Sequence, residues 1–122
     1  MATSPEFLAH SLGPDGTVVV DRLVKDLHIT KAELAAASGL SRDAVSKTAR
    51  LKSRRTQKRL GEVVGIINRV LPWTGSVQAA FAWYRSQPLP GFGDQTAEDL
   101  VKVGRGEAVR QYLSRIAVGG YA

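Results

Sequence analysis

The stretch from residue 34 to residue 47, LAAASGLSRDAVSK, constrains the fold more than any other part of the chain. Ala35, Gly39 and Val45 stand four and then six residues apart, which is the spacing of a helix-turn-helix. The small residue lets two helices cross closely, the glycine takes the positive φ that the turn needs, and the valine fills the space between the helices. Such an element places the start of its second helix in a DNA major groove. The pattern therefore predicts a DNA-binding helix pair.

Positive charge is concentrated directly after this motif. Residues 42–59 include eight basic residues and one acidic residue, whereas the rest of the chain holds nine basic and ten acidic residues. The net charge of +6 is therefore local. A phosphate-binding surface collects its charge beside the reading element, and the alternative is a solvated basic face on an ordinary helical bundle. Together with the helix-turn-helix spacing, the charge favours contact with DNA.

The start of the second helix would face the floor of the groove, with Ser41 as its N-cap. We expect Arg42 to pair with guanine, Asp43 to accept from cytosine, and Ser46 to tolerate several bases. Phosphate contacts are expected from the basic side chains that follow, which are Lys47, Arg50, Lys52, Arg54, Arg55, Lys58 and Arg59. A module of this size buries too little surface to select a genomic site alone, so we expect a homodimer on a palindromic, double-stranded operator.

Several classes of function are disfavoured by what the sequence lacks. There is no cysteine, and the two histidines have no carboxylate at metal-ligand spacing, so neither a metal site nor a cofactor is predicted. The glycine-containing segments 90–94 and 104–107 neither follow a strand nor carry the lysine of a phosphate loop. No nucleophile, base and metal come together in the pattern, so we expect no enzyme. No membrane span and no signal sequence are recognisable, so we expect a cytoplasmic protein.

In the N-terminal half, residues 1–16 carry two prolines and two glycines and fit either a loose arm or a short lead-in helix. Apolar residues at helical spacing favour a helix over about residues 17–27, although three adjacent valines also fit a short strand. Thr30 and Glu33 form a capping box that begins the next helix. We divide this half into an arm at 1–16 and a helix-turn-helix DNA-binding domain at 17–72.

The pattern of the remaining chain, with a C-terminal domain at 73–122, is also helical. An amphipathic helix that starts at Lys58 and Arg59, with apolar residues from Leu60 onward, runs until Pro72 stops it. Gly61 and Gly65 on it are expected to let another helix come close. Shorter helices are predicted after it, at about 76–86, 97–102 and up to 119. The fold class that follows is all-α, with six or seven helices.

The chain has the order helix-turn-helix, long aliphatic helix, Trp83, Pro88, the loop PGFGDQTAEDLV and the closing helix EAVRQYLSRIAVGG. Through this order, over about residues 29–120, it resembles the Xre/MbcA/ParS group of bacterial antitoxins. Ala97 stands where the group often has proline, which removes a ring that fixes φ at the first helical position. The resemblance implies a toxin-binding domain and a partner, a RES-domain toxin of a family that consumes NAD.

In such pairs the C-terminal end of the antitoxin covers the NAD pocket of the toxin. The resemblance assigns this role to Ile116, Val118, Gly119, Gly120 and Tyr121, with Trp83 and Phe92 as aromatic anchors. Aromatic side chains are enriched at interface hot spots. Trp83 and Phe92 also fit a hydrophobic core at these spacings, and the final Gly-Gly-Tyr-Ala also fits a frayed terminus.

Three functions are compatible with these features. The first is an antitoxin that neutralises its cognate toxin and represses its own operon. The second is an Xre-family transcriptional repressor without a toxin partner, whose second half only dimerises. The third is an RNA-binding or other adaptor module that uses the basic face on a different polyanion. Genome context separates them, because an antitoxin gene adjoins a toxin gene.

Overall fold

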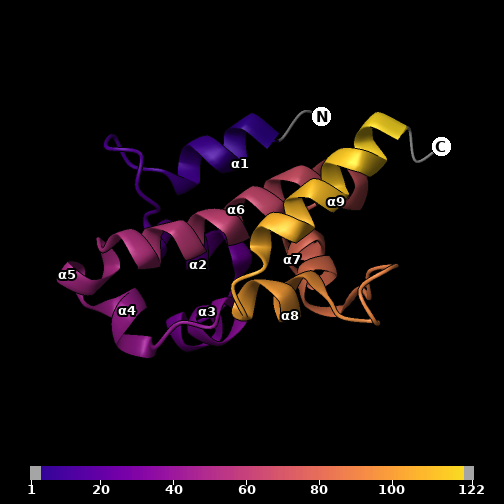
Figure 1. The fold of residues 1–122 in the computed structure, drawn as a ribbon. Coiled ribbons are helices and arrows are strands. Elements are labelled where there is room, and N and C mark those ends of the chain that lie inside the picture. Colours follow the sequence, from indigo (N-terminus) through magenta and orange to yellow (C-terminus); the bar gives the residue numbers. More distant parts are fainter. Residues whose placement is uncertain (1–3, 120–122) are drawn as a thin grey trace.

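The part of the chain that the computed structural model describes, residues 4–119, contains nine helices and no strand (Figure 1). The helices are α1 Ser4–Ser11, α2 Val20–Leu27, α3 Lys31–Ser38, α4 Arg42–Ser46, α5 Thr48–Leu51, α6 Arg54–Thr74, α7 Val77–Ser86, α8 Ala97–Lys102 and α9 Gly106–Gly119. The all-α prediction is confirmed. Nine helices replace the expected six or seven because the N-terminal segment is helical and the segment after Ser41 is divided into two helices.

The N-terminal segment forms helix α1 rather than a loose arm. Phe7 of α1 is buried in the core, so the segment is part of the fold. Leu12 and Val18 then pair in an isolated antiparallel bridge, and α2 begins at Val20. The run of valines therefore supplies one bridging residue and the first residue of a helix, which combines the two alternatives that its composition leaves open.

Helix α6, 21 residues long, is central to the structure and packs against α1, α3, α5, α7, α8 and α9. Pro72 does not end this helix, contrary to the prediction. A proline has no amide to donate within a helix, but the chain after it bonds back to α6. The Thr74 hydroxyl donates to the Val70 carbonyl at 3.1 Å, and the Gly75 amide donates to the Leu71 carbonyl at 2.9 Å. The helix thus continues to Thr74, and the expected boundary between residues 72 and 73 falls inside it.

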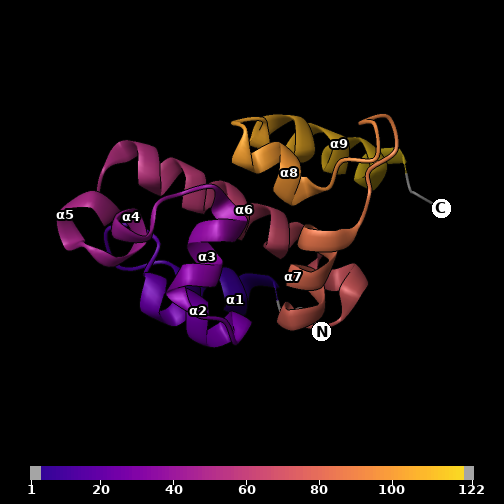
Figure 2. The ribbon, with the colours of Figure 1, turned by 90° about the horizontal axis from the view of Figure 1, so that it is seen from below.

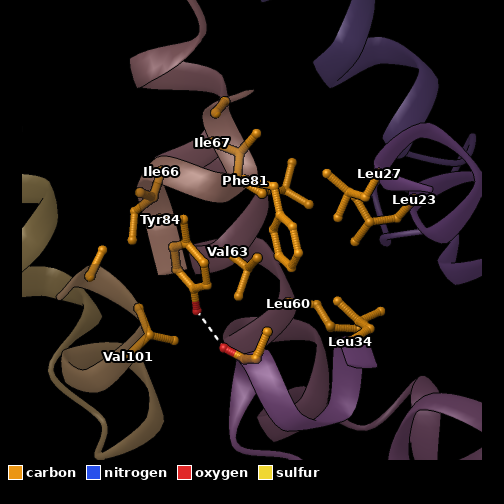
Figure 3. Packing of buried hydrophobic residues seen from close by; sticks show 14 of the residues in the cluster. Leu23, Leu27, Leu34, Leu60, Val63, Ile66, Ile67, Phe81, Tyr84 and Val101 are labelled. Carbon is orange, nitrogen blue, oxygen red and sulfur yellow. Dashed lines mark hydrogen bonds between the residues drawn. The ribbon is translucent and has the colours of Figure 1, made fainter. Parts of the chain in front are cut away.

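One cluster of buried side chains joins the two halves of the chain (Figure 3). Phe81 and Tyr84 of α7 lie in its centre, near Leu34 of α3 and Leu60 of α6. The Tyr84 hydroxyl donates to the carbonyl oxygen of Ala37 at 2.7 Å. Burial raises the pKa of Tyr84 far above its usual value, so the hydroxyl remains a neutral donor. Helix α3 is therefore held in place by a residue of the C-terminal half.

The glycines that bring helices close are not the predicted ones. A Cβ atom added at Gly61 or at Gly65 would meet no described atom within 4 Å, so the expectation of a close helix at these positions is wrong. The close approach occurs at Gly106, the first residue of α9, where a Cβ would lie 2.5 Å from Oε1 of Glu62. Glu62 is only 6% exposed and its carboxylate pairs with Lys58 at 3.0 Å. The start of α9 is therefore packed directly against α6.

Gly106→Ala is expected to lower the free energy of unfolding by about 1–3 kcal/mol, because the added methyl group must displace the buried carboxylate of Glu62. Gly61→Ala is the matched control, and it should raise the free energy of unfolding by up to about 1 kcal/mol because it removes a glycine from an exposed helix interior. Urea denaturation of both variants measures the difference. Equal free energies of unfolding of the two variants would show that Glu62 moves aside at no cost.

Candidate nucleic-acid interface and C-terminal binding domain

Helices α3 and α4 form a close pair at the predicted position. The capping box at the start of α3 is confirmed, since the Glu33 amide donates to the Thr30 hydroxyl at 3.0 Å and the Glu33 carboxylate accepts from the Thr30 amide at 2.8 Å. Gly39 has a φ of 71°, and Ala35 and Val45 are buried. A Cβ at Gly39 would also lie 3.0 Å from Cα of Lys102 in α8. The turn thus needs glycine both for its backbone angle and for its contact with the C-terminal half.

The second helix of the pair is only five residues long. It begins at Arg42, where the Ser41 hydroxyl accepts from the amide of Ala44 at 3.1 Å. It ends at Ser46, because the next residue, Lys47, is extended with a φ of −91° and a ψ of 125°. In a continuous helix, Val45 and Leu51 would point about 120° apart. The break lets both pack on the core, Val45 fully and Leu51 partly. Arg50 consequently belongs to the separate helix α5 and not to the same helix as Arg42.

The residues predicted to contact DNA lie together on the surface of α4, α5 and the start of α6. The structure leaves nine of them exposed, namely Ser41, Arg42, Asp43, Ser46, Lys47, Arg50, Lys52, Arg54 and Arg55. Figures 1 and 2 place α4 and α5 at one end of the molecule. The side chains of four arginines form no ion pair or hydrogen bond within the described chain, and these are Arg42, Arg50, Arg54 and Arg55. This surface, which we call the α4–α6 basic surface, therefore presents unpaired guanidinium groups to solvent.

Two lysines of the basic surface have acidic neighbours. Lys47 lies 3.8 Å from Asp43, and Lys52 lies 3.4 Å from Asp15. The hydroxyl and amide of Thr17, with a smaller effect of Lys52, lower the pKa of Asp15 to about 2. Asp15 is therefore charged at neutral pH and competes with any phosphate for Lys52. A hollow of about 640 Å³ separates the loop that carries Asp15 from α4 and α5.

Lys58 and Arg59, which were also expected to contact phosphate, have partners within the fold. Nη1 of Arg59 donates to the carbonyl oxygen of Ser38 at 2.8 Å and so caps the end of α3. Lys58 pairs with Glu62 one turn further along α6. The structure therefore uses these two cations to hold α3 and α6, and the unpaired arginines of the α4–α6 basic surface are the four that precede them in the chain.

The C-terminal half is built around α8, and its start is as predicted. Thr96 and Asp99 form a capping box at this start, since they exchange hydrogen bonds of 3.1 Å in both directions. Ala97, which stands in place of the proline, is fully buried. Glu98 is 6% exposed and accepts from Nε of Arg85 at 2.6 Å and from Nη2 at 3.2 Å, which joins α8 to α7. The hydrogen bonding of Thr96 and Asp99 thus begins the helix without the proline.

The side chains predicted to contact a toxin are partly engaged in the core. Trp83 and Ile116 are half-buried and pack against it. Phe92 meets Tyr112 edge to face, with ring centroids 6.0 Å apart, and the guanidinium of Arg105 lies 5.9 Å from its centroid. Helix α9 runs to Gly119, but the side chain of Val118 and the whole of Gly120 and Tyr121 lie outside the described residues.

The end of α6, together with α7, α8 and α9, corresponds to a known domain. Residues 70–119 match the family described as the antitoxin Xre/MbcA/ParS C-terminal toxin-binding domain. Residues 70–119 are thus similar to the toxin-binding domain of this antitoxin family. The matched stretch begins in the last turns of α6. Comparison with curated proteins and with solved structures gave no match.

The described residues contain no group of three or more histidine, cysteine or carboxylate side chains that is able to hold a metal ion. None of their helices is long and apolar enough to cross a membrane.

Proposed function

We propose that this protein is an antitoxin that neutralises a RES-type, NAD-consuming toxin and represses its own operon by binding DNA. The observation that carries the proposal is the match of residues 70–119 to a toxin-binding domain of antitoxins. The exposed, unpaired arginines of the α4–α6 basic surface support the second activity. Both partners would be met in the cytoplasm, and neither activity requires a catalytic group in this chain.

Neutralisation would depend on the end of α9. Val109 and Leu113 are fully buried, so the first part of α9 is anchored in the fold. The described end of the helix lies at the edge of the molecule in both ribbon views (Figures 1 and 2). An anchored helix that ends at an edge is suited to reach into a pocket of a second protein. In the proposed complex, Ile116 and the residues after it cover the NAD pocket of the toxin, and Trp83 and Phe92 support the contact.

Repression would depend on the other end of the molecule. In the proposed complex, the helix-turn-helix of α3 and α4 places Arg42, Asp43 and Ser46 in the major groove, and the arginines of α5 and α6 meet the phosphates. Two copies of the chain on a palindromic operator would bring two such surfaces onto one face of the duplex. The two partners would thus be bound by opposite ends of the molecule.

Expression of the adjacent gene in bacteria, alone and together with this chain, tests the proposal. The neighbour alone should stop growth and deplete NAD, and co-expression with this chain should restore both growth and the NAD level. Removal of residues 117–122 should release the toxin and leave operator binding unchanged, which serves as the control for folding. A neighbour without effect on growth would contradict the antitoxin function and leave the Xre-family repressor. Full neutralisation by the shortened chain would place the inhibitory contact elsewhere.

A further inference from the structure

The outward side of α9 carries a cluster of arginines. Residues 107, 110, 111, 114 and 115 recur at helical spacing on one side of α9, and all five are polar and exposed. Arg69 reaches this side from α6, and its Nη2 donates to the Ser114 hydroxyl at 3.2 Å. Six residues line a hollow of about 400 Å³, namely Arg69, Glu107, Arg110, Gln111, Ser114 and Arg115. We call this hollow the arginine groove.

The charges of the arginine groove are not balanced within the described chain. Its only carboxylate, Glu107, lies 3.8 Å from Arg110. Arg69 and Arg115 have no carboxylate within ion-pair distance among the described residues. The apolar side of α9 is already buried through Val109 and Leu113, so the packing of the helix does not need these arginines. The groove thus offers two guanidinium groups without an anionic partner.

The arginine groove is separate from the α4–α6 basic surface. Arg69 follows Arg54 by 15 residues on the same helix, which corresponds to about 22 Å along the helix axis. Five of the six lining residues lie within the stretch that matches the toxin-binding domain. This position favours a protein partner over the DNA that the other end of the molecule is proposed to bind.

We propose that the arginine groove binds an acidic surface of the toxin, with Arg69 and Arg115 pairing with aspartate or glutamate side chains. The inference rests on the proposed function and adds the chemistry of the partner surface. A guanidinium group is only weakly hydrated and forms bidentate pairs with carboxylates. It therefore loses less hydration free energy than an ammonium group when it enters an interface. These pairs would lie beside the end of α9 and orient it at the mouth of the toxin pocket.

Charge reversal tests this inference with the purified, catalytically inactive toxin encoded by the adjacent gene. Arg69→Glu and Arg115→Glu should each weaken toxin binding at least tenfold in calorimetry, and added salt should weaken wild-type binding because the attraction is screened. Lys25→Glu on α2 is the matched control, because Lys25 is exposed and the substitution changes the net charge equally. Its affinity for the toxin should equal that of the wild type.

Cross-linking identifies the partner groups directly. Arg115→Lys retains the charge and adds an amine, so a carbodiimide should join residue 115 to a toxin carboxylate through an amide bond, with loss of water. Mass spectrometry of the joined peptides should then find an aspartate or glutamate of the toxin. Equal toxin affinities of the Arg69→Glu, Arg115→Glu and Lys25→Glu variants would overturn the inference while the antitoxin function stands. Loss of operator binding in the Arg115→Glu variant, with toxin binding intact, would also overturn it. If the wild-type chain does not bind the toxin at all, the proposed function itself fails.

Discussion

Tyr84→Ala is expected to lower the free energy of unfolding by about 3–5 kcal/mol, because the substitution removes a large side chain from the centre of the core. Tyr84 is fully buried and stacks on Phe81, with ring centroids 6.0 Å apart and an angle of 16° between the planes. Figure 3 shows the ring between α6, α8 and the helix pair, with its hydroxyl directed to the carbonyl of Ala37. The cavity would therefore open where the two halves of the chain meet.

Tyr84→Phe distinguishes the contribution of the hydroxyl to stability from that of the ring. This variant keeps the packing and loses the donor to Ala37, so we expect a smaller loss of about 1–3 kcal/mol. Guanidinium denaturation measures both variants, and amide hydrogen exchange at the end of α3 should speed up in Tyr84→Phe. A Tyr84→Ala variant within about 1 kcal/mol of the wild type would show that α7 is not part of one cooperative core. Equal losses in the two variants would assign the whole effect to the hydroxyl.

Local signals in the sequence predict the starts of helices well. The capping boxes at Thr30 and Thr96 and the N-cap at Ser41 involve residues no more than three positions apart, so a short window of sequence contains all the atoms concerned. The break at Lys47 is different, because it depends on both Val45 and Leu51 reaching the core. Likewise, α6 passes Pro72 because Thr74 and Gly75 bond back to it.

The same distinction holds for the candidate sites. The sequence shows that cations gather after the helix pair, and the structure leaves the expected ones exposed except Arg59. Which of these cations bond to another group of the fold depends on partners far away in the chain. Arg59 bonds to Ser38, 21 residues earlier, and Lys52 pairs with Asp15, 37 residues earlier. Arg69 of the arginine groove bonds to Ser114, 45 residues later. In the sequence, only the regular spacing of polar residues on α9 indicates that groove.

Replacement of Arg50, Arg54 and Arg55 by glutamine is expected to weaken operator binding about 100-fold or more at low salt, because each arginine would lose a charge-assisted contact with phosphate. Since the lost contacts no longer release counterions, the negative slope of log affinity against log salt concentration should become shallower by about 2.7. The loss should be similar on operator and on unrelated DNA. Arg42→Ala should instead weaken operator binding by about 1–3 kcal/mol and relax the preference for one base.

A second triple variant controls for net charge. Replacement of Lys25, Arg69 and Arg115 by glutamine removes the same number of positive charges from exposed positions outside the α4–α6 basic surface. Fluorescence anisotropy at several salt concentrations measures the DNA affinities. The DNA affinity of this variant and its salt slope should both be close to the wild-type values. If both triple variants lose the same affinity and the same slope, overall charge attracts the duplex and the α4–α6 basic surface does not bind it specifically. A loss confined to the first variant would instead assign DNA binding to the end of the molecule where α4 and α5 lie.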